Sequence, residues 1–353
     1  MHSSPLRCLS RPAFCFVLAI VAASAPGWCA VAASVAAAPP DYAATGPRSV
    51  TGVLVEVVDT GRDRRVPLKL HLPSGTDVLP VVLFSHGLGG SREGGRGWGE
   101  HWASHGFLSI HLQHPGSDES ILRDGTGQGE DKAPGQGKGR MRDAVREALT
   151  PRAFADRVAD VRFVLDLLER EPARIHAGVV RRDPKHVGLS GHSYGARTTL
   201  AVAGERVPFA SGEFADARVR AGIVFSPMAP PPPESWPRRF GAIAMPLLSV
   251  TGTLDRDIIG GASPDARREP FRHMPPGDKY LLVLEGADHM VFNAHDGGRL
   301  PAAANQQAIL AHVRAVTLAF WKAYLSGDAD ARRWLAGDGV RAALGGAGTI
   351  QSK

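Results

Sequence analysis

Residues 191–195 form the pattern Gly-x-Ser-x-Gly, with Ser193 at its centre. An apolar run from Val187 precedes this pattern, and a run of helix-forming residues, 196–203, follows it. A serine placed this way sits on a sharp strand-to-helix turn that exposes its hydroxyl above the edge of a sheet. The helix N-terminus beside it favours a developing oxyanion. The pattern predicts that Ser193 is a nucleophile; the alternative is an ordinary tight turn.

A serine nucleophile needs a base to take its proton and an acid to orient that base. In a parallel sheet such groups lie at the carboxyl ends of strands. Asp255 follows the apolar run 245–251, and His289 follows the apolar run 279–285. Along the chain, the order Ser193, Asp255, His289 is the order of an α/β-hydrolase triad.

Alternatives to this triad stay open at both partners. Asp257 is a rival acid, and Asp255 is preferred because Gly252-x-x-Asp255 makes the tighter turn. An aspartate in such a loop can also simply cap it. His289 can also be an ordinary solvent-exposed histidine.

A glycine-rich corner, residues 86–90, follows the apolar run 80–85. Backbone N–H groups at such a corner can point at a reacting oxygen. We expect the N–H groups of Leu88 and Tyr194 to form an oxyanion hole. Clustered histidines at 101, 105, 111 and 114 could suggest zinc, but neither a cysteine nor a His-Glu-x-x-His pattern accompanies them. No metal and no cofactor is expected.

The elements that must position these groups alternate between strands and helices. Residues 50–58 and 66–72 predict an antiparallel pair. Continuous apolar runs predict buried strands at 80–85, 107–112, 219–225, 245–251 and 279–285. Helices are predicted at 97–105, from Thr150 to about 170, at 304–325 and from about 328. This alternation predicts an α/β fold, a mostly parallel sheet with N-terminal antiparallel strands and helices on both faces.

Within the helix that begins after Thr150, apolar residues at 154, 158, 161, 165 and 168 form one stripe. Its other face carries charged residues, among them Arg157 and Asp160. The glycine-rich segment 115–140 is predicted to be a loop, either a solvated insertion or a flap over the site. A proline-rich segment, 230–233, is either the wall of an acyl pocket or a rigid surface loop.

Residues 1–38 have the outline of a secretory signal peptide, with Arg7 and Arg11 before an apolar run at 14–23 and small residues after it. The run is too short for a confident membrane span, and an uncleaved anchor is the alternative. All three cysteines lie in this leader (Cys8, Cys15, Cys29), so the mature chain would have no disulfide. We therefore expect an exported protein, periplasmic or secreted, with no stable membrane span once the leader is removed.

The remaining chain is divided into a linker at 39–47, a catalytic domain at 48–341 and a C-terminal tail at 342–353. The formal net charge is +6, and basic residues are interleaved with acidic ones. This pattern gives no reason to expect nucleic-acid binding. The expected partner is a small-molecule ester, and the sequence does not indicate an oligomeric state.

Four segments, at 84–93, 103–107, 163–166 and 191–195, resemble the platelet-activating-factor acetylhydrolase-like branch of the α/β-hydrolases. Exported bacterial members of this branch are often labelled dienelactone-hydrolase-like. The resemblance covers about residues 48–340. It implies Ser193, Asp255 and His289 as the triad, and Leu88 and Tyr194 as oxyanion donors.

The chain departs from the family pattern at two places. Dienelactone hydrolases proper use a cysteine nucleophile, whereas this chain has Ser193. In the animal acetylhydrolases the acid follows the strand just after the nucleophile helix; here that place, 225–228, has no acid, so the implied acid is Asp255, one strand later. Phospholipid specificity is not carried over.

These observations together predict an exported, cofactor-free serine ester hydrolase that works through an acyl-enzyme. Short-chain acyl esters are the first candidate substrates, followed by polyesters and phospholipid-type esters. Acyl transfer or peptide cleavage on the same fold is one alternative. A catalytically inactive hydrolase fold that serves in binding is another.

Overall fold

The computed structural model describes residues 40–122, 136–209, 214–256, 261, 263–294 and 305–353. The predicted leader at 1–38, the rival acid Asp257 and part of the predicted glycine-rich loop lie outside these residues. Residues 40–353 cluster as one unit. The description below concerns this unit.

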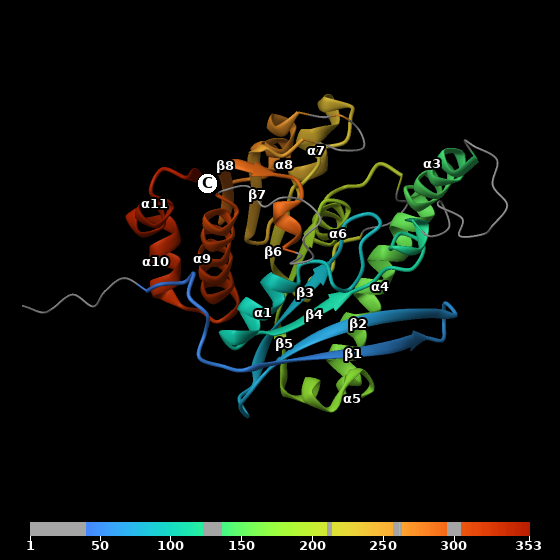
Figure 1. Cartoon of the computed structure of the whole chain (residues 1–353), viewed down its shortest axis with the longest axis horizontal. Helices are drawn as coiled ribbons and strands as arrows, with labels where there is room; N and C mark the ends of the chain where they lie inside the picture. Colours follow the sequence, from blue (N-terminus) through green and yellow to red (C-terminus); the bar gives the residue numbers. More distant parts are fainter. Residues whose placement is uncertain (1–39, 123–135, 210–213, 257–260, 262, 295–304) are drawn as a thin grey trace, which may run out of the picture. The chain divides into compact units, whose positions relative to one another are not determined.

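A single mixed sheet, in the order β1-β2-β4-β3-β5-β6-β7-β8-β9, forms the centre of the unit (Figure 1). From β4 to β8 all neighbouring strands run parallel, while β1, β2 and β9 are antiparallel additions at the two edges. The strands are β1 Val50–Asp59, β2 Arg64–Pro73, β3 Leu79–Ser85, β4 Leu108–Leu112, β5 Arg182–His192, β6 Val219–Phe225, β7 Leu247–Leu254, β8 Lys279–Asp288 and β9 Gly348–Ser352. The prediction of a mostly parallel sheet with N-terminal antiparallel strands is confirmed.

Helices cover both faces of the sheet. The longer ones are α1 Arg96–Ser104, α3 Gln136–Ala148, α4 Pro151–Arg170, α6 Tyr194–Val202, α9 Gln306–Leu325, α10 Ala329–Ala336 and α11 Asp338–Leu344. The short helical segments are α5 Pro172–Ile175, η1 Ala177–Arg181, η2 Pro233–Ser235, α7 Trp236–Phe240, η3 Pro264–Arg268, α8 Glu269–His273 and η4 Val291–Asn293. Thr150 caps α4 by accepting a hydrogen bond from the N–H of Ala153 (3.2 Å), as the sequence predicts.

Alternate residues of β3 point into two different cores, because successive side chains of a strand face opposite sides of the sheet. Val82 and Phe84 belong to the core covered by α1 and α9, whereas Val81 and Leu83 belong to the core covered by α4. Trp98 of α1 stacks on Phe225 with ring centroids 5.7 Å apart. The two cores together fix the carboxyl ends of the parallel strands in place.

The predicted linker and the predicted C-terminal tail both make contacts with the rest of the fold. In the predicted linker, Tyr42 is buried, and the carbonyl groups of Tyr42 and Ala44 accept hydrogen bonds from the rings of His101 (3.1 Å) and His105 (2.9 Å). In the predicted tail, α11 is followed by β9, which pairs with β8. β9 gives the backbone of β8 partners at what would otherwise be an open edge.

The predicted loop at 115–140 is only partly a loop. Residues 136–140 begin α3. The first residues of the segment 115–140 are bound to the glycine-rich corner, since Gly89 N–H donates to Ser117 O (2.9 Å) and Glu119 N–H donates to Gly90 O (2.8 Å). The segment that starts this region is therefore part of the corner's support.

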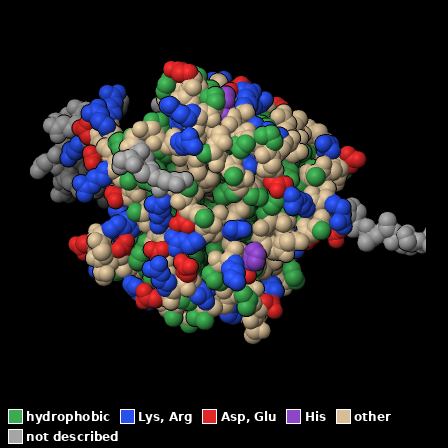
Figure 2. All heavy atoms as spheres, turned by 180° about the vertical axis from the view of Figure 1, so that it is seen from behind, with side chains coloured by type: hydrophobic (Ala, Val, Ile, Leu, Met, Phe, Trp, Pro, Cys, Tyr) green, Lys and Arg blue, Asp and Glu red, His purple; other side chains and the backbone are tan. Residues whose placement is uncertain are grey.

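In the described part of the chain, one helix, α9, is long and apolar enough to cross a membrane by length and hydropathy, and 67% of its most apolar window is buried. This burial is typical of the core helix of a folded domain. On the face shown in Figure 2, Lys and Arg side chains are interspersed with Asp and Glu side chains.

Candidate active site

Ser193 lies on a strained turn between β5 and α6. Its backbone has φ 55° and ψ −111°, a region that few non-glycine residues adopt. The N–H of Ser193 donates to Phe225 O (2.9 Å), which ties the turn to β6. A Cβ on Gly195 would overlap the carbonyl oxygen of Ser85, and one on Gly191 would overlap the carbonyl of Gly195. The turn thus has the geometry predicted for a nucleophile elbow.

His289 and Asp255 meet at the carboxyl ends of β8 and β7, each directly after its strand. Nδ1 of His289 lies 2.8 Å from Oδ1 of Asp255, and Thr251 Oγ1 donates to the other carboxylate oxygen (2.8 Å). Both residues are buried. A carboxylate only accepts, so Nδ1 carries the proton and Nε2 is left as the basic nitrogen.

The carboxylate of Asp255 stays ionised in this buried setting. Burial by itself raises the pKa of Asp255, but the hydrogen bond from His289 and the charge of Arg267 outweigh it and hold the pKa below its usual value. An ionised acid is what the orientation of an imidazole base requires.

His192 links His289 to the turn that carries Ser193. Its Nε2 donates to the backbone oxygen of His289 (2.9 Å), and the two rings lie with centroids 4.7 Å apart. Since Ser193 is the next residue, His289 lies beside the elbow. Among the described residues no hydrogen bond joins Ser193 Oγ to His289 Nε2, and such contacts often tighten only when substrate binds. Burial lowers the pKa of His192 to about 3, so it is neutral at ordinary pH.

Arg267 of η3 is a buried neighbour of the pair that the sequence did not reveal. Its Nε lies 3.3 Å from Oδ1 of Asp255, its Nη2 lies 3.2 Å from Nδ1 of His289, and its Nη1 donates to Ser226 O (3.2 Å). The surrounding sequence is a charged stretch of the kind usually found on surfaces, so no local pattern marks this residue.

The predicted oxyanion corner lies against Ser193. A Cβ built on Gly87 would be 3.4 Å from the Cβ of Ser193. In the described residues the N–H of Leu88 donates no hydrogen bond, and the N–H of Tyr194, in the first turn of α6, has no partner within the helix. Both predicted donors are therefore free to bind an oxyanion.

The direction of the Leu88 N–H is fixed by His86. The N–H of His114 donates to Nε2 of His86 (3.0 Å), so Nδ1 of His86 carries the proton and donates to Gly87 O (2.6 Å). In a trans peptide the C=O and the following N–H point in opposite directions. Holding Gly87 O in this way aims the N–H of Leu88.

The histidines that could have suggested zinc have other partners. His111 Nδ1 donates to Gly94 O (2.8 Å), and His114 Nδ1 binds Asp160 Oδ2 (3.0 Å). In the part of the chain that the structure describes, no group of three or more His, Cys, Asp or Glu side chains could hold a metal ion.

The proline-rich segment is held by Trp236, which donates its indole N–H to Pro230 O (2.9 Å).

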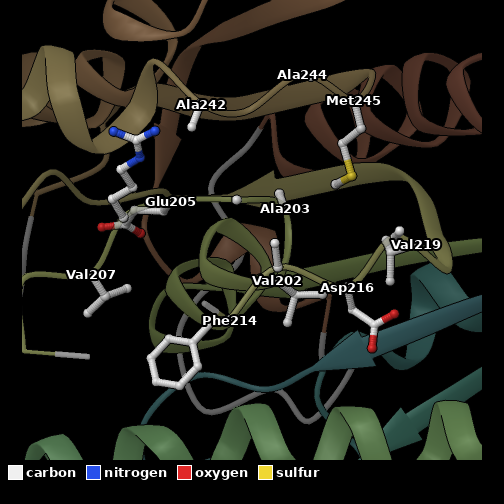
Figure 3. Close-up of a pocket in the computed structure, with 14 residues that line it drawn as sticks. Val202, Ala203, Glu205, Val207, Phe214, Asp216, Val219, Ala242, Ala244 and Met245 are labelled. Atoms are coloured by element: carbon white, nitrogen blue, oxygen red, sulfur yellow. The ribbon is translucent and has the colours of Figure 1, made fainter. Parts of the chain in front are cut away.

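A pocket of about 530 Å³ lies elsewhere on the molecule (Figure 3). Its walls come from the end of α6 and the segments just before β6 and β7, with Val202, Glu205 and Met245 among the lining residues. These positions are at the amino ends of the strands, whereas Ser193, Asp255 and His289 follow the carboxyl ends. The pocket is therefore not part of the candidate active site.

Comparison with known proteins finds one family. Residues 46–136 match the family model of platelet-activating factor acetylhydrolase, isoform II. The match spans β1 to β4 and includes the corner with Leu88, but it ends before Ser193. No curated protein matches the chain. The match and the order of the sheet together define an α/β-hydrolase fold, and this similarity supports hydrolase activity.

Proposed function

We propose that this protein is an exported serine carboxylic-ester hydrolase. Ser193 Oγ attacks the ester carbonyl carbon while Nε2 of His289 takes its proton. The N–H groups of Leu88 and Tyr194 bind the resulting oxyanion. His289 then returns the proton to the leaving alcohol, and a water molecule activated by the same nitrogen releases the acid from the acyl-enzyme. Asp255 holds the imidazole in place and stabilises its charged form.

The observation that carries this proposal is the junction of the elbow with the histidine–aspartate pair. The positive φ of Ser193, the 2.8 Å contact of His289 with Asp255, and the 2.9 Å bond from His192 to His289 O bring three groups from separate strands to one edge of the sheet.

Small acyl esters are the proposed substrates. The matching family is named for an acetylhydrolase, which removes a two-carbon acyl group. Acyl transfer to another alcohol and peptide cleavage use the same acyl-enzyme and are outcomes that the assay below separates from hydrolysis.

The decisive variant is Ser193→Ala, assayed on nitrophenyl esters from acetate to octanoate, with a competing alcohol and a peptide substrate in parallel. We expect wild-type turnover to be highest with the shorter acyl chains, and Ser193→Ala to lose at least about 10³-fold in kcat because the nucleophile is gone. Unchanged turnover in the variant would end the proposal. An inactive wild type would favour a binding role for the fold.

Export is a separate part of the proposal, resting on Arg7, Arg11 and the apolar run that follows them. Expression of the full chain in a bacterium followed by N-terminal sequencing tests it. We expect the mature chain to begin after Ala32 or after Ala38. Recovery of the intact leader in the cytoplasm would contradict export without affecting the proposed chemistry.

A further inference from the structure

Arg157 of α4 is a fully buried cation close to the candidate site. Burying a charge is costly unless the group is well partnered. In the described residues no carboxylate forms an ion pair with Arg157, because Asp160, one turn further along α4, is bound to Arg64 (2.7 Å) and His114 (3.0 Å). Burial lowers the pKa of Arg157 to about 10, so it remains charged at neutral pH. The hydrogen bonds that Arg157 donates all go to neutral oxygens, and Asp160 and Asp118 stabilise its charge only at longer range.

Part of the guanidinium holds the oxyanion corner. Nη2 donates to Ser85 Oγ (2.9 Å) and to the carbonyl oxygen of His86, and Nη1 donates to Ser117 Oγ (2.8 Å). The backbone oxygen of Ser117 in turn accepts a hydrogen bond from the N–H of Gly89 (2.9 Å). These bonds therefore hold the corner at His86, before Leu88, and at Gly89, after it.

The rest of the same guanidinium holds the first turn of α6. Nε donates to Thr198 Oγ1 (3.1 Å), and Thr198 Oγ1 donates to the carbonyl oxygen of Tyr194 (3.2 Å). The guanidinium carbon lies 4.6 Å from the centre of the Tyr194 ring. Tyr194 is the second predicted oxyanion donor.

We propose that Arg157 is a positioning residue for the oxyanion hole, because one rigid guanidinium joins the corner that carries the Leu88 donor to the helix turn that carries the Tyr194 donor. The inference rests on the proposed function. The two N–H groups come from segments more than a hundred residues apart, and they must lie at hydrogen-bond distance from one developing oxygen. The planar fork of an arginine can fix both segments at once, which a lysine cannot do.

The test compares Arg157→Lys, Arg157→Met and Thr198→Val with the wild type. A fluorophosphonate titration counts active sites, so that every rate refers to folded protein. kcat and KM are measured on nitrophenyl butyrate. The inhibition constant is measured for a butyl trifluoromethyl ketone, which forms a tetrahedral oxyanion on a serine and so reports on the hole itself.

We expect kcat to fall by about 10-fold in Arg157→Lys and by about 100-fold in Arg157→Met, with KM changed by less than about 3-fold, since a misplaced oxyanion donor costs transition-state binding. The inhibition constant should rise in parallel with the loss of kcat. Thr198→Val leaves the arginine in place but removes one acceptor, so it should show the same pattern with a loss of about 3-fold to 10-fold.

Arg239→Lys is the matched control. Arg239 is also a buried arginine, but it pairs with Glu205 and donates to Pro230 O (2.9 Å), away from the corner and the elbow. It should lower the melting temperature and leave kcat and the inhibition constant unchanged.

Arg157 variants that lose only thermal stability, with wild-type kcat and inhibition constant, would overturn the inference while the esterase assignment stands. If Arg157→Met does not fold, Arg157→Lys and Thr198→Val decide the question. A wild type that neither hydrolyses esters nor reacts with the titrant overturns the proposed function, and the inference with it.

Discussion

Ser193 occupies a strained backbone conformation that its neighbours impose. Its N–H is bound to β6, and the glycines on either side leave no room for side chains. Strain of this kind persists where the surrounding packing over-determines it, and it is common at sites of chemistry. His289 is likewise fixed by a neighbour: the carboxylate of Asp255 accepts a hydrogen bond from Nδ1–H and so selects this form of the ring.

Asp255→Asn tests this role at the residue scale. Asparagine keeps the size of the side chain but no longer imposes the Nδ1–H tautomer, so Nε2 ceases to be a reliable base. We expect kcat on nitrophenyl butyrate to fall by about 10³-fold to 10⁴-fold, with little change in KM.

Asp257→Asn is the control for that variant, because Asp257, two residues further along the chain, is the rival acid. It should retain activity to within about 3-fold. A larger loss in Asp257→Asn than in Asp255→Asn would show that the acid is assigned to the wrong residue.

At the scale of elements, the site depends on how closely α6 approaches the end of β3. Gly195 in the first turn of α6 leaves no space for a Cβ, because that atom would overlap the backbone of Ser85. The contact is backbone against backbone, so a rotamer change cannot relieve it. The same approach brings the glycine-rich corner beside Ser193.

Gly195→Ala should therefore force α6 away from β3. We expect a loss of about 2 kcal/mol or more in the free energy of unfolding, together with a large loss of activity, as overpacking displaces the elbow from the corner. Denaturant unfolding and ester turnover measure the two effects.

Gly139→Ala is the matched control, since Gly139 lies exposed in α3 with open space around its Cα. There the same change should be neutral or should stabilise the helix by about 0.5–1 kcal/mol. Equal destabilisation by both variants would contradict the close-packing explanation.

At the scale of the whole molecule, a set of histidines is buried in the neutral form. Burial lowers the pKa of His111 and His114 to about 4 and that of His192 to about 3, and it lowers the pKa of His86 well below the usual value. In the unfolded chain these side chains take up a proton below about pH 6.5. The unfolded state then binds more protons than the folded state, so acid favours unfolding.

We predict that stability is constant above about pH 6.5 and falls as the pH is lowered toward 4, by about 1.4 kcal/mol per pH unit for each such histidine. Denaturant unfolding at pH 7.5 and pH 5.0 measures this difference. His111→Gln removes one of these histidines, so it should reduce the change in unfolding free energy with pH by about 1.4 kcal/mol per pH unit. Equal stability at the two pH values would contradict the burial of these rings in neutral form.

Local sequence patterns were sufficient to predict the parallel strands, the sharp turn at Ser193, and the positions of Asp255 and His289 directly after β7 and β8. Each of these depends on residues close together in the chain, such as an apolar run followed by a small or titratable residue. They did not reveal that α4 also buries part of its polar face: Arg157 and Asp160, opposite the apolar stripe, are fully buried. That burial depends on contacts with Ser85, His114 and Thr198, which no periodicity within α4 can report.

The same reason applies to the contacts at the two ends of the domain. The sequence predicts a linker at 39–47 and a tail at 342–353 but gives no contacts for either. Both segments are held by partners distant in sequence, His101 and His105 for residues 42–44, and β8 for β9.

The most direct measurement for the central claim is covalent labelling of the folded wild type with a fluorophosphonate, followed by intact mass spectrometry and peptide mapping. An activated serine reacts with such a probe, whereas ordinary serine hydroxyls are poor nucleophiles. We predict a single adduct on Ser193, formed at a rate that drops sharply in His289→Ala. No adduct on the folded protein, or an adduct on another residue, would contradict the account.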